Sequence, residues 1–148
     1  MTVLAAVDST GYKIVLLLHI ITAVVAFAPA FMTYAVARAA EKGDRGAADA
    51  LATGLQRLAI PAMVLVGILG YGLVGMSDKV FTMSQAWVSV AGVAWIALIA
   101  VTVFLTRPAV RALASGVEGA RQKVMMSTGI THLLFVVLIV MMVFKPGQ

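Results

Sequence analysis

Residues 14–37 read IVLLLHIITAVVAFAPAFMTYAVA and contain no Asp, Glu, Lys or Arg. Three further stretches lack these residues in the same way, at 58–77, 80–106 and 124–144. A bilayer core is crossed by about 20 apolar residues at a rise of about 1.5 Å each, so each stretch is long enough to span it as a helix. Helices also satisfy their own backbone hydrogen bonds inside lipid. The sequence therefore predicts an all-α fold, a transmembrane four-helix bundle.

The composition agrees with this class of protein. The chain of 148 residues is 62% hydrophobic and 11% charged, whereas a soluble domain is roughly a quarter charged. This balance excludes an ordinary soluble domain and a disordered chain. Nucleic acid is not expected as a partner, because the basic residues are better explained as topology charges. The chain has no cysteine, so disulfides and thiolate metal sites are excluded.

We place the spans in one membrane domain, at about residues 13–38, 57–77, 81–106 and 122–144, with cytoplasmic loops at 39–56 and 107–121. Helix-start signals precede three of them: Asp8-Ser9-Thr10, the T-x-x-Q pattern from Thr82 to Gln85, and the S-x-x-E pattern from Ser115 to Glu118. Pro108 is expected to end the third helix.

The basic residues predict how the bundle is oriented. Eight lie in the two connections assigned to the cytoplasm: Arg38, Lys42, Arg45, Arg57, Arg107, Arg111, Arg121 and Lys123. The opposite side has three, Lys13, Lys79 and Lys145. Cytoplasmic loops carry the excess of Lys and Arg. We therefore expect a multi-pass protein of the bacterial cytoplasmic (inner) membrane, with both termini outside and the lipid bilayer around it.

The first span has two unlike faces when its residues are placed at about 100° per position. One face is small and polar: His19, Thr22, Ala23, Ala26, Ala30, Thr33 and Ala37. The other is bulky: Leu17, Ile21, Val24, Val25, Phe31 and Met32. Small faces pack against protein in a membrane, so His19 is predicted to point into the bundle.

The second span is rich in glycine, with Gly67, Gly70, Gly72 and Gly75. We interpret these residues as sites of close helix packing. The alternative is a flexible or unwound segment that lines a ligand cavity. In the fourth span Met125, Thr128, Gly129 and His132 share a face.

The candidate chemistry rests on His19 and His132, the only two histidines in the chain. Inward-facing histidines on two helices of a bundle can hold a b-type haem. Their levels differ by about 9 Å in the predicted spans, so a site at His19 alone is equally open, as is a histidine that only forms a hydrogen bond. Copper at the outer methionines Met76, Met83, Met141 and Met142 is a further alternative. The spans lack charged residues and catalytic motifs, so enzymatic activity is not favoured.

Two short motifs carry a family resemblance. The stretch from Lys13 to Ile20, KIVLLLHI, and the ending from Met142 to Gly147, MVFKPG, resemble those of an uncharacterised bacterial integral membrane family, domain of unknown function 2269. The layout is also similar to the copper-resistance D proteins and to the HemJ-type protoporphyrinogen oxidases. The resemblance implies four or five helices in the inner membrane, with haem associated with His19. The sequence after His19 lacks the Trp-Gly-Gly and Leu-Pro-Arg stretches of the oxidases, so oxidase activity is not carried over.

The sequence favours a small, non-enzymatic accessory or interaction protein. We expect it to pack against other membrane subunits or a second copy of itself, mainly through Gly67, Gly70, Gly72 and Gly75. The alternative is a haem b or copper protein that uses His19, with or without His132. Permeation of a small solute is a third class, and it would need an uncharged channel.

Overall fold

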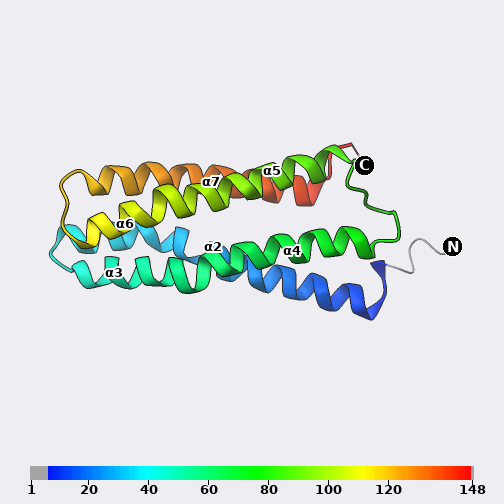
Figure 1. The fold of residues 1–148 in the computed structure, drawn as a ribbon, viewed down its shortest axis with the longest axis horizontal. Coiled ribbons are helices and arrows are strands. Elements are labelled where there is room, and N and C mark those ends of the chain that lie inside the picture. The colour runs from blue at the N-terminus through cyan, green and yellow to red at the C-terminus, as the bar shows by residue number, and fades with distance from the viewer. Residues whose placement is uncertain (1–6, 148) are drawn as a thin grey trace.

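The computed structural model describes residues 7–147, which form helices and turns without any strand. Its elements are α2 (Thr10–Glu41), α3 (Arg45–Gly54), the π-helical turn η1 (Leu55–Ala59), α4 (Ile60–Met76), α5 (Ala86–Val101), the π-helical turn η2 (Thr102–Thr106), α6 (Arg107–Ala114) and α7 (Ala120–Phe144). Because α3, η1 and α4 run on without a break, as do α5, η2 and α6, the chain folds into four long rods (Figure 1). The predicted all-α four-helix bundle is confirmed.

Each of the four rods is long and apolar enough to cross a membrane. Large apolar side chains cover the outside of the bundle, among them Phe104 and Phe144, which are 74% and 75% exposed. A soluble bundle would bury such side chains, whereas a bilayer supplies an apolar surrounding for them. The exposed apolar surface and the length of the rods therefore both indicate a bundle that lies in a membrane.

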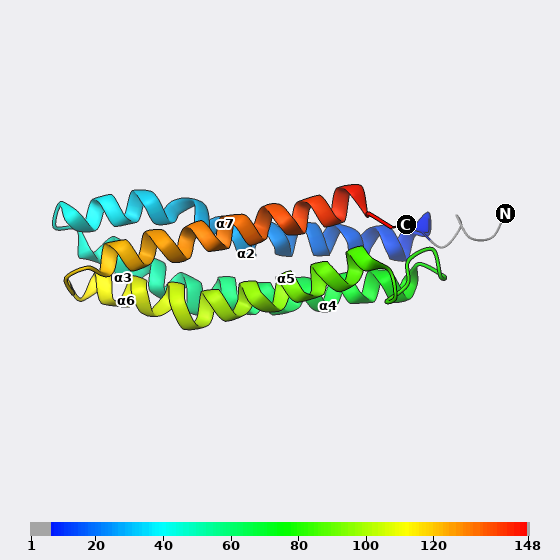
Figure 2. The ribbon, with the colours of Figure 1, turned by 90° about the horizontal axis from the view of Figure 1, so that it is seen from above.

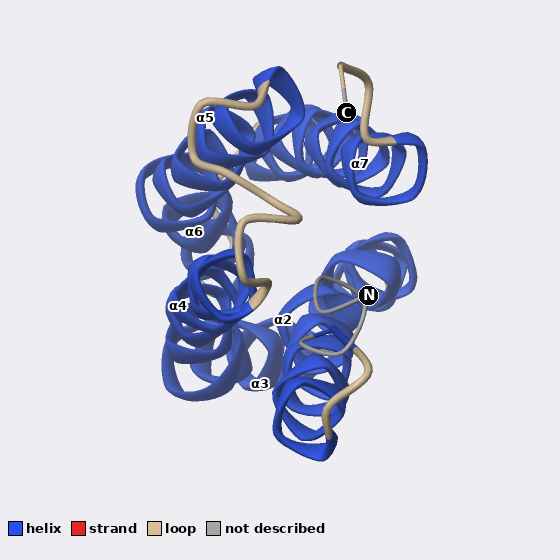
Figure 3. Cartoon of the chain, turned by 90° about the vertical axis from the view of Figure 1, so that its right-hand side faces the viewer, coloured by secondary structure: helices blue, strands red, loops and turns tan. Residues whose placement is uncertain are grey.

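The rods follow one another around the bundle. α2 packs beside α3 and α4, α3 packs against α6, and α7 closes the bundle against α5, α6 and α2. Both described ends of the chain lie at one end of the bundle, and the α2–α3 and α6–α7 turns lie at the other (Figures 1 and 2). Seen along the bundle, α2 with α4 and α5 with α7 form two pairs (Figure 3).

The helices are longer than the predicted spans, at the end that carries α3 and α6. The predicted loop 39–56 is mostly helical, since α2 continues to Glu41 and α3 begins at Arg45. Asp44 caps α3 by accepting a hydrogen bond of 3.3 Å from the Ala47 N–H. Ala48, Leu51 and Ala52 of α3 are buried in one apolar cluster with Val110 and Leu113 of α6. This amphipathic pattern escapes a search for uncharged stretches, because the exposed faces of both helices carry charges.

Pro108 does not end the third rod, and that prediction is wrong. The helix passes through η2 and continues as α6 to Ala114. The Arg107 N–H reaches back five residues to the Thr102 carbonyl, which is the hydrogen bond of a π turn. Pro61 follows the same arrangement, with the Ile60 N–H bonded to the Leu55 carbonyl. A π turn changes the path of the backbone just before the proline, so the ring is accommodated within the helix.

The helix starts were predicted with mixed success. Ser9 caps α2, as expected from Asp8-Ser9-Thr10, by accepting a hydrogen bond of 3.2 Å from the Tyr12 N–H. Gln85 Oε1 accepts a hydrogen bond of 3.1 Å from the Thr82 N–H, as the T-x-x-Q pattern predicts, but α5 begins only after Gln85. α7 begins after Gly119 and not at Ser115, because Gly116 and Gly119 adopt positive φ angles and form a tight turn.

Candidate functional site

The two faces predicted for α2 are confirmed. Ala26, Thr33 and Ala37 are almost fully buried, whereas the bulky residues on the other side are exposed. The His19 ring points to α4, where its Nδ1 lies 2.9 Å from the Val66 carbonyl oxygen. A carbonyl can only accept a hydrogen bond, so Nδ1 carries the proton and donates it. In the neutral ring, Nε2 then carries the lone pair.

The structure does not bring His19 and His132 together. The His132 ring lies against Phe31 of α2, with ring centroids 5.3 Å apart. Phe31 is twelve residues beyond His19 on the same helix, which is a separation of about 18 Å along the axis. Two axial ligands of one haem iron must face each other across a single flat ring, and this separation is too large for that. Among residues 7–147, no three His, Asp or Glu side chains gather where they could hold a metal ion.

The outer methionines lie in different surroundings. Met141 packs against the Phe81–Trp87 cluster, while the Met76 Cε atom lies beside Gly11 of α2. Met83 and Met142 are exposed. The contacts thus place Met76 and Met141 against different rods.

Glycines let aromatic rings pack closely between the rods. The Trp95 ring of α5 covers Gly67 of α4, and its Nε1 donates a hydrogen bond of 2.7 Å to the Met63 carbonyl. In return, the Tyr71 hydroxyl of α4 covers Gly92 of α5. His19 covers Gly70 in the same manner. The predicted close packing is therefore confirmed for Gly67 and Gly70, but within the chain itself.

Gly72 and Gly75 are different. A Cβ added at either position would have no atom within 4 Å, apart from its chain neighbours and the backbone of its own helix. Both are exposed. They share a stripe of α4 with the exposed side chains of Leu65 and Ile68. We call Leu65, Ile68, Gly72 and Gly75 the α4 stripe. Packing within the described chain leaves this stripe uncovered.

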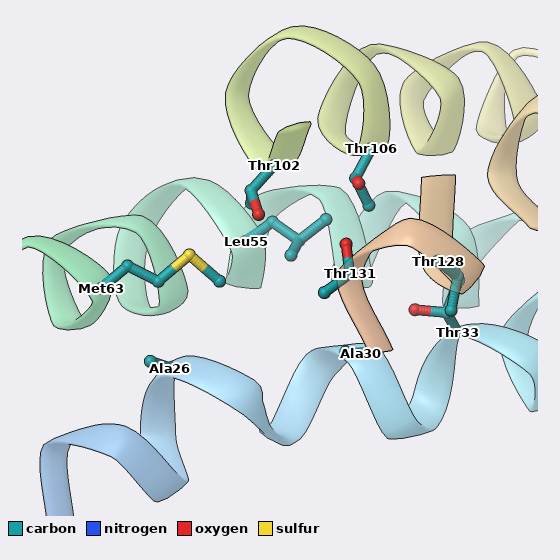
Figure 4. Close-up of a pocket in the computed structure, with 9 residues that line it drawn as sticks. All are labelled: Ala26, Ala30, Thr33, Leu55, Met63, Thr102, Thr106, Thr128 and Thr131. Atoms are coloured by element: carbon teal, nitrogen blue, oxygen red, sulfur yellow. The ribbon is translucent and has the colours of Figure 1, made fainter. Parts of the chain in front are cut away.

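The interior of the bundle holds a small cavity of about 10 Å³. Five of the residues that line it are threonines from three rods: Thr33 of α2, Thr102 and Thr106 of η2, and Thr128 and Thr131 of α7. Figure 4 shows Thr102 and Thr106 projecting from one side of the cavity toward Thr131 and Thr33 on the other. Ala26, Ala30, Leu55 and Met63 complete an otherwise apolar wall. A group of hydroxyls thus lies deep in an apolar protein.

The threonines fall into two groups by their hydrogen bonds. Thr33 Oγ1 donates to the Pro29 carbonyl at 2.9 Å, and Thr131 Oγ1 donates to the Ser127 carbonyl at 3.0 Å. Thr102, Thr106 and Thr128 are only 1%, 6% and 5% exposed, yet their hydroxyls have no hydrogen-bond partner. A buried hydroxyl without a partner is costly, so these three side chains mark the least satisfied part of the core.

The sequence predicted part of this cavity, with Thr33 on the inward face of the first span and Thr128 on a shared face of the fourth. It did not predict Thr102 and Thr106, because nothing in the spacing of the third span sets them apart. The structure places both threonines in η2, which ends two residues before Pro108.

Polar contacts secure the end of the bundle that carries the excess of basic residues. Gln56 Oε1 accepts a hydrogen bond of 2.8 Å from Arg111 and another from Arg107. Arg121 at the start of α7 pairs with Glu41 at the end of α2, at 2.8 Å. At the opposite end, Lys13 lies 2.6 Å from Asp8 and holds the pKa of that carboxyl below its usual value.

The four apolar rods, with a cluster of threonines between them, define a multi-pass membrane protein of the all-α class. Comparison of the chain with protein-family models, with curated proteins and with solved structures found no match.

Proposed function

We propose that the protein works by association inside the bilayer, with a helix of another membrane subunit or of a second copy packed on the α4 stripe. The observation that carries this proposal is the contrast among the glycines of α4. Gly67 and Gly70 are each covered by a side chain of this chain, whereas Gly72 and Gly75 are uncovered. Small residues let two helix backbones approach closely in a membrane, so the α4 stripe is suited to a further helix.

Cysteine cross-linking in native membranes tests this function, because the chain has no cysteine of its own. Gly72→Cys should form a cross-linked product, either at twice the chain mass or at the mass of a partner complex. The matched control is Leu17→Cys on the lipid-facing side of α2. Leu17 is 57% exposed and lies near the level of Gly72, because His19 contacts Gly70 on the antiparallel α4. Equal cross-linking at both positions, or none at Gly72, would refute the proposal.

A second candidate function is binding of haem b or copper at His19. A metal-binding histidine usually donates its other ring N–H to a carbonyl or carboxylate, which fixes the ring. His19 has this arrangement with Val66, and its Nε2 would serve as the ligand. The resemblance of the first span to that of haem-associated proteins points the same way. The separation of the histidines leaves His132 as a bystander in this function.

Absorption spectra and metal analysis of the purified protein test the second candidate. Haem at His19 predicts a Soret band that shifts on reduction and disappears in His19→Ala but persists in His132→Ala. Copper predicts about one bound ion per chain that is lost with His19. A colourless, metal-free protein would exclude both.

We further propose that the protein resides in the bacterial inner membrane with both termini outside. The excess of Lys and Arg lies at the end that carries α3 and α6, and both described chain ends lie at the other end (Figure 1). Charge asymmetry of this kind sets the orientation of membrane helices. A tag on either terminus that reacts only from the cytoplasmic side would reverse this assignment.

A further inference from the structure

We propose that the threonine-lined cavity is a binding site for one water molecule, held by hydroxyls from α2, η2 and α7. The cavity of about 10 Å³ is close to the smallest volume that holds one water, about 10–15 Å³. Its polar lining consists of threonines, and the rest of the wall is apolar. A small polar molecule in this place would therefore take its hydrogen bonds from Thr hydroxyls.

The three unpartnered threonines carry the argument. A threonine in a lipid-exposed helix commonly donates to the carbonyl four residues earlier, as Thr33 and Thr131 do here. Thr102, Thr106 and Thr128 do not, although they are at least nine-tenths buried. Since the large majority of buried side-chain polar atoms have a hydrogen-bond partner, we expect these hydroxyls to bond a molecule inside the cavity.

The hydrogen-bond capacities of the two groups are complementary. Thr33 and Thr131 have given their protons to backbone carbonyls, so toward the cavity they can only accept. Thr102, Thr106 and Thr128 still have protons to donate. Water accepts two hydrogen bonds and donates two, and buried waters typically form about three. One water can therefore accept hydrogen bonds from two of the three unpartnered hydroxyls and donate to the third and to Thr33 or Thr131.

A monovalent cation fits this set less well than water. It would use the lone pairs of the hydroxyls but would leave the protons of Thr102, Thr106 and Thr128 without acceptors. No Asp or Glu lies in any of the four uncharged stretches, so the charge would also lack a counterion in a medium where that is expensive. The donor arrangement therefore favours a neutral molecule.

The position of the site gives the water a structural task. The residues that line the cavity come from α2, from η2 in the third rod and from α7, and Leu55 of η1 also lines it. A water bonded to threonines on three of these elements connects rods that are far apart in the sequence. It would also fix the third rod at its π turn, where the regular helical bonding changes.

The sign of a stability change tests the proposal. Thr128→Val and Thr106→Val keep the side-chain shape but remove one hydroxyl each, and unfolding temperatures are measured by tryptophan fluorescence in lipid nanodiscs. If a water bridges the hydroxyls, each change removes one of its partners and lowers the unfolding temperature by about 4 °C. If the cavity is dry, each change removes an unsatisfied group and raises the unfolding temperature. Thr22→Val is the control, because Thr22 bonds its own Leu18 carbonyl outside the cavity.

Two further measurements settle the identity of the occupant. The unfolding temperature is compared in sodium chloride and in choline chloride; equal values support water, and a rise with sodium overturns the proposal in favour of a cation. Should the valine variants fail to fold, an experimental structure that resolves ordered waters decides on the wild-type chain. A single peak within hydrogen-bond distance of Thr106 and Thr128 confirms the site, and an empty cavity refutes it.

Discussion

Gly67→Ala is expected to lower the free energy of unfolding by about 3 kcal/mol, from overpacking together with a lost buried hydrogen bond. A Cβ on Gly67 would lie 2.1 Å from Cε2 and 2.7 Å from Nε1 of Trp95. Carbon atoms normally approach to about 3.5–4.0 Å, so the indole has to move by more than about 1 Å. This movement breaks the bond of 2.7 Å from Trp95 Nε1 to the Met63 carbonyl.

The magnitude follows from two terms. A buried donor left without its partner costs about 1–3 kcal/mol, and forcing extra volume into a packed interface costs about 1–3 kcal/mol. Gly72→Ala is the matched control, because it makes the same change on the same helix where nothing lies within 4 Å. It should leave the stability unchanged or raise it by up to about 1 kcal/mol, because alanine favours the helix over glycine.

Unfolding in mixed micelles with increasing SDS, followed by tryptophan fluorescence, measures both variants. The double change Gly67→Ala with Trp95→Phe adds a test of mechanism, since the smaller ring leaves space for the new methyl group. The cost of the alanine should fall clearly in the Trp95→Phe background, as contacting residues are not additive. A Gly67→Ala protein as stable as Gly72→Ala would refute the reasoning.

Other contacts give further expectations. Ser77→Ala should destabilise the α4–α5 turn by about 1–3 kcal/mol, measured by the same unfolding assay, because the buried Ser77 hydroxyl accepts a hydrogen bond from the Phe81 N–H and donates within the turn. Glu41→Gln should cost no more than about 1 kcal/mol, and less in high salt, since the partly exposed Glu41–Arg121 pair is screened by water and ions. Lys13→Gln should raise the pKa of Asp8, as followed by NMR titration, because Lys13 is what lowers it. The stabilising effect of that pair is present above the ordinary Asp8 pKa of 3.8 and is lost as the pH falls through the lower folded value; an unchanged titration in Lys13→Gln would show that the ion pair does not form.

The sequence predicted those parts of the fold that depend on one helix at a time. Uncharged length identified the four rods, and the contrast between small and bulky residues placed His19 and Thr33 inside and Phe31 outside. The extent of α3 and α6 was not predictable in this way. Their charged faces hide an apolar side that becomes visible only when Leu51 and Leu113 are seen in one buried cluster.

The candidate site was predicted only in part, for a related reason. The positions of His19 and His132 within their spans predicted that the two residues lie at different levels in the membrane. The structure shows a larger separation between them than predicted. The threonine cavity depends on how η2 meets α2 and α7, which no single helix contains. Thr102 and Thr106 lie in a π turn, where the backbone departs from 3.6 residues per turn.

The two π turns divide their rods into segments that are phased separately. A π turn takes up five residues where an α-helix needs about four for nearly the same rotation and rise, so deleting one residue from Leu55–Ala59 would restore a regular helix with little change in the relative orientation of the two segments. Gly67 and Gly70 would then still face Trp95 and His19, and Ala48 and Leu51 would keep their places. A related chain that is one residue shorter here would build the same bundle with its glycines one position earlier in the sequence, and an alignment without a gap would conceal the correspondence.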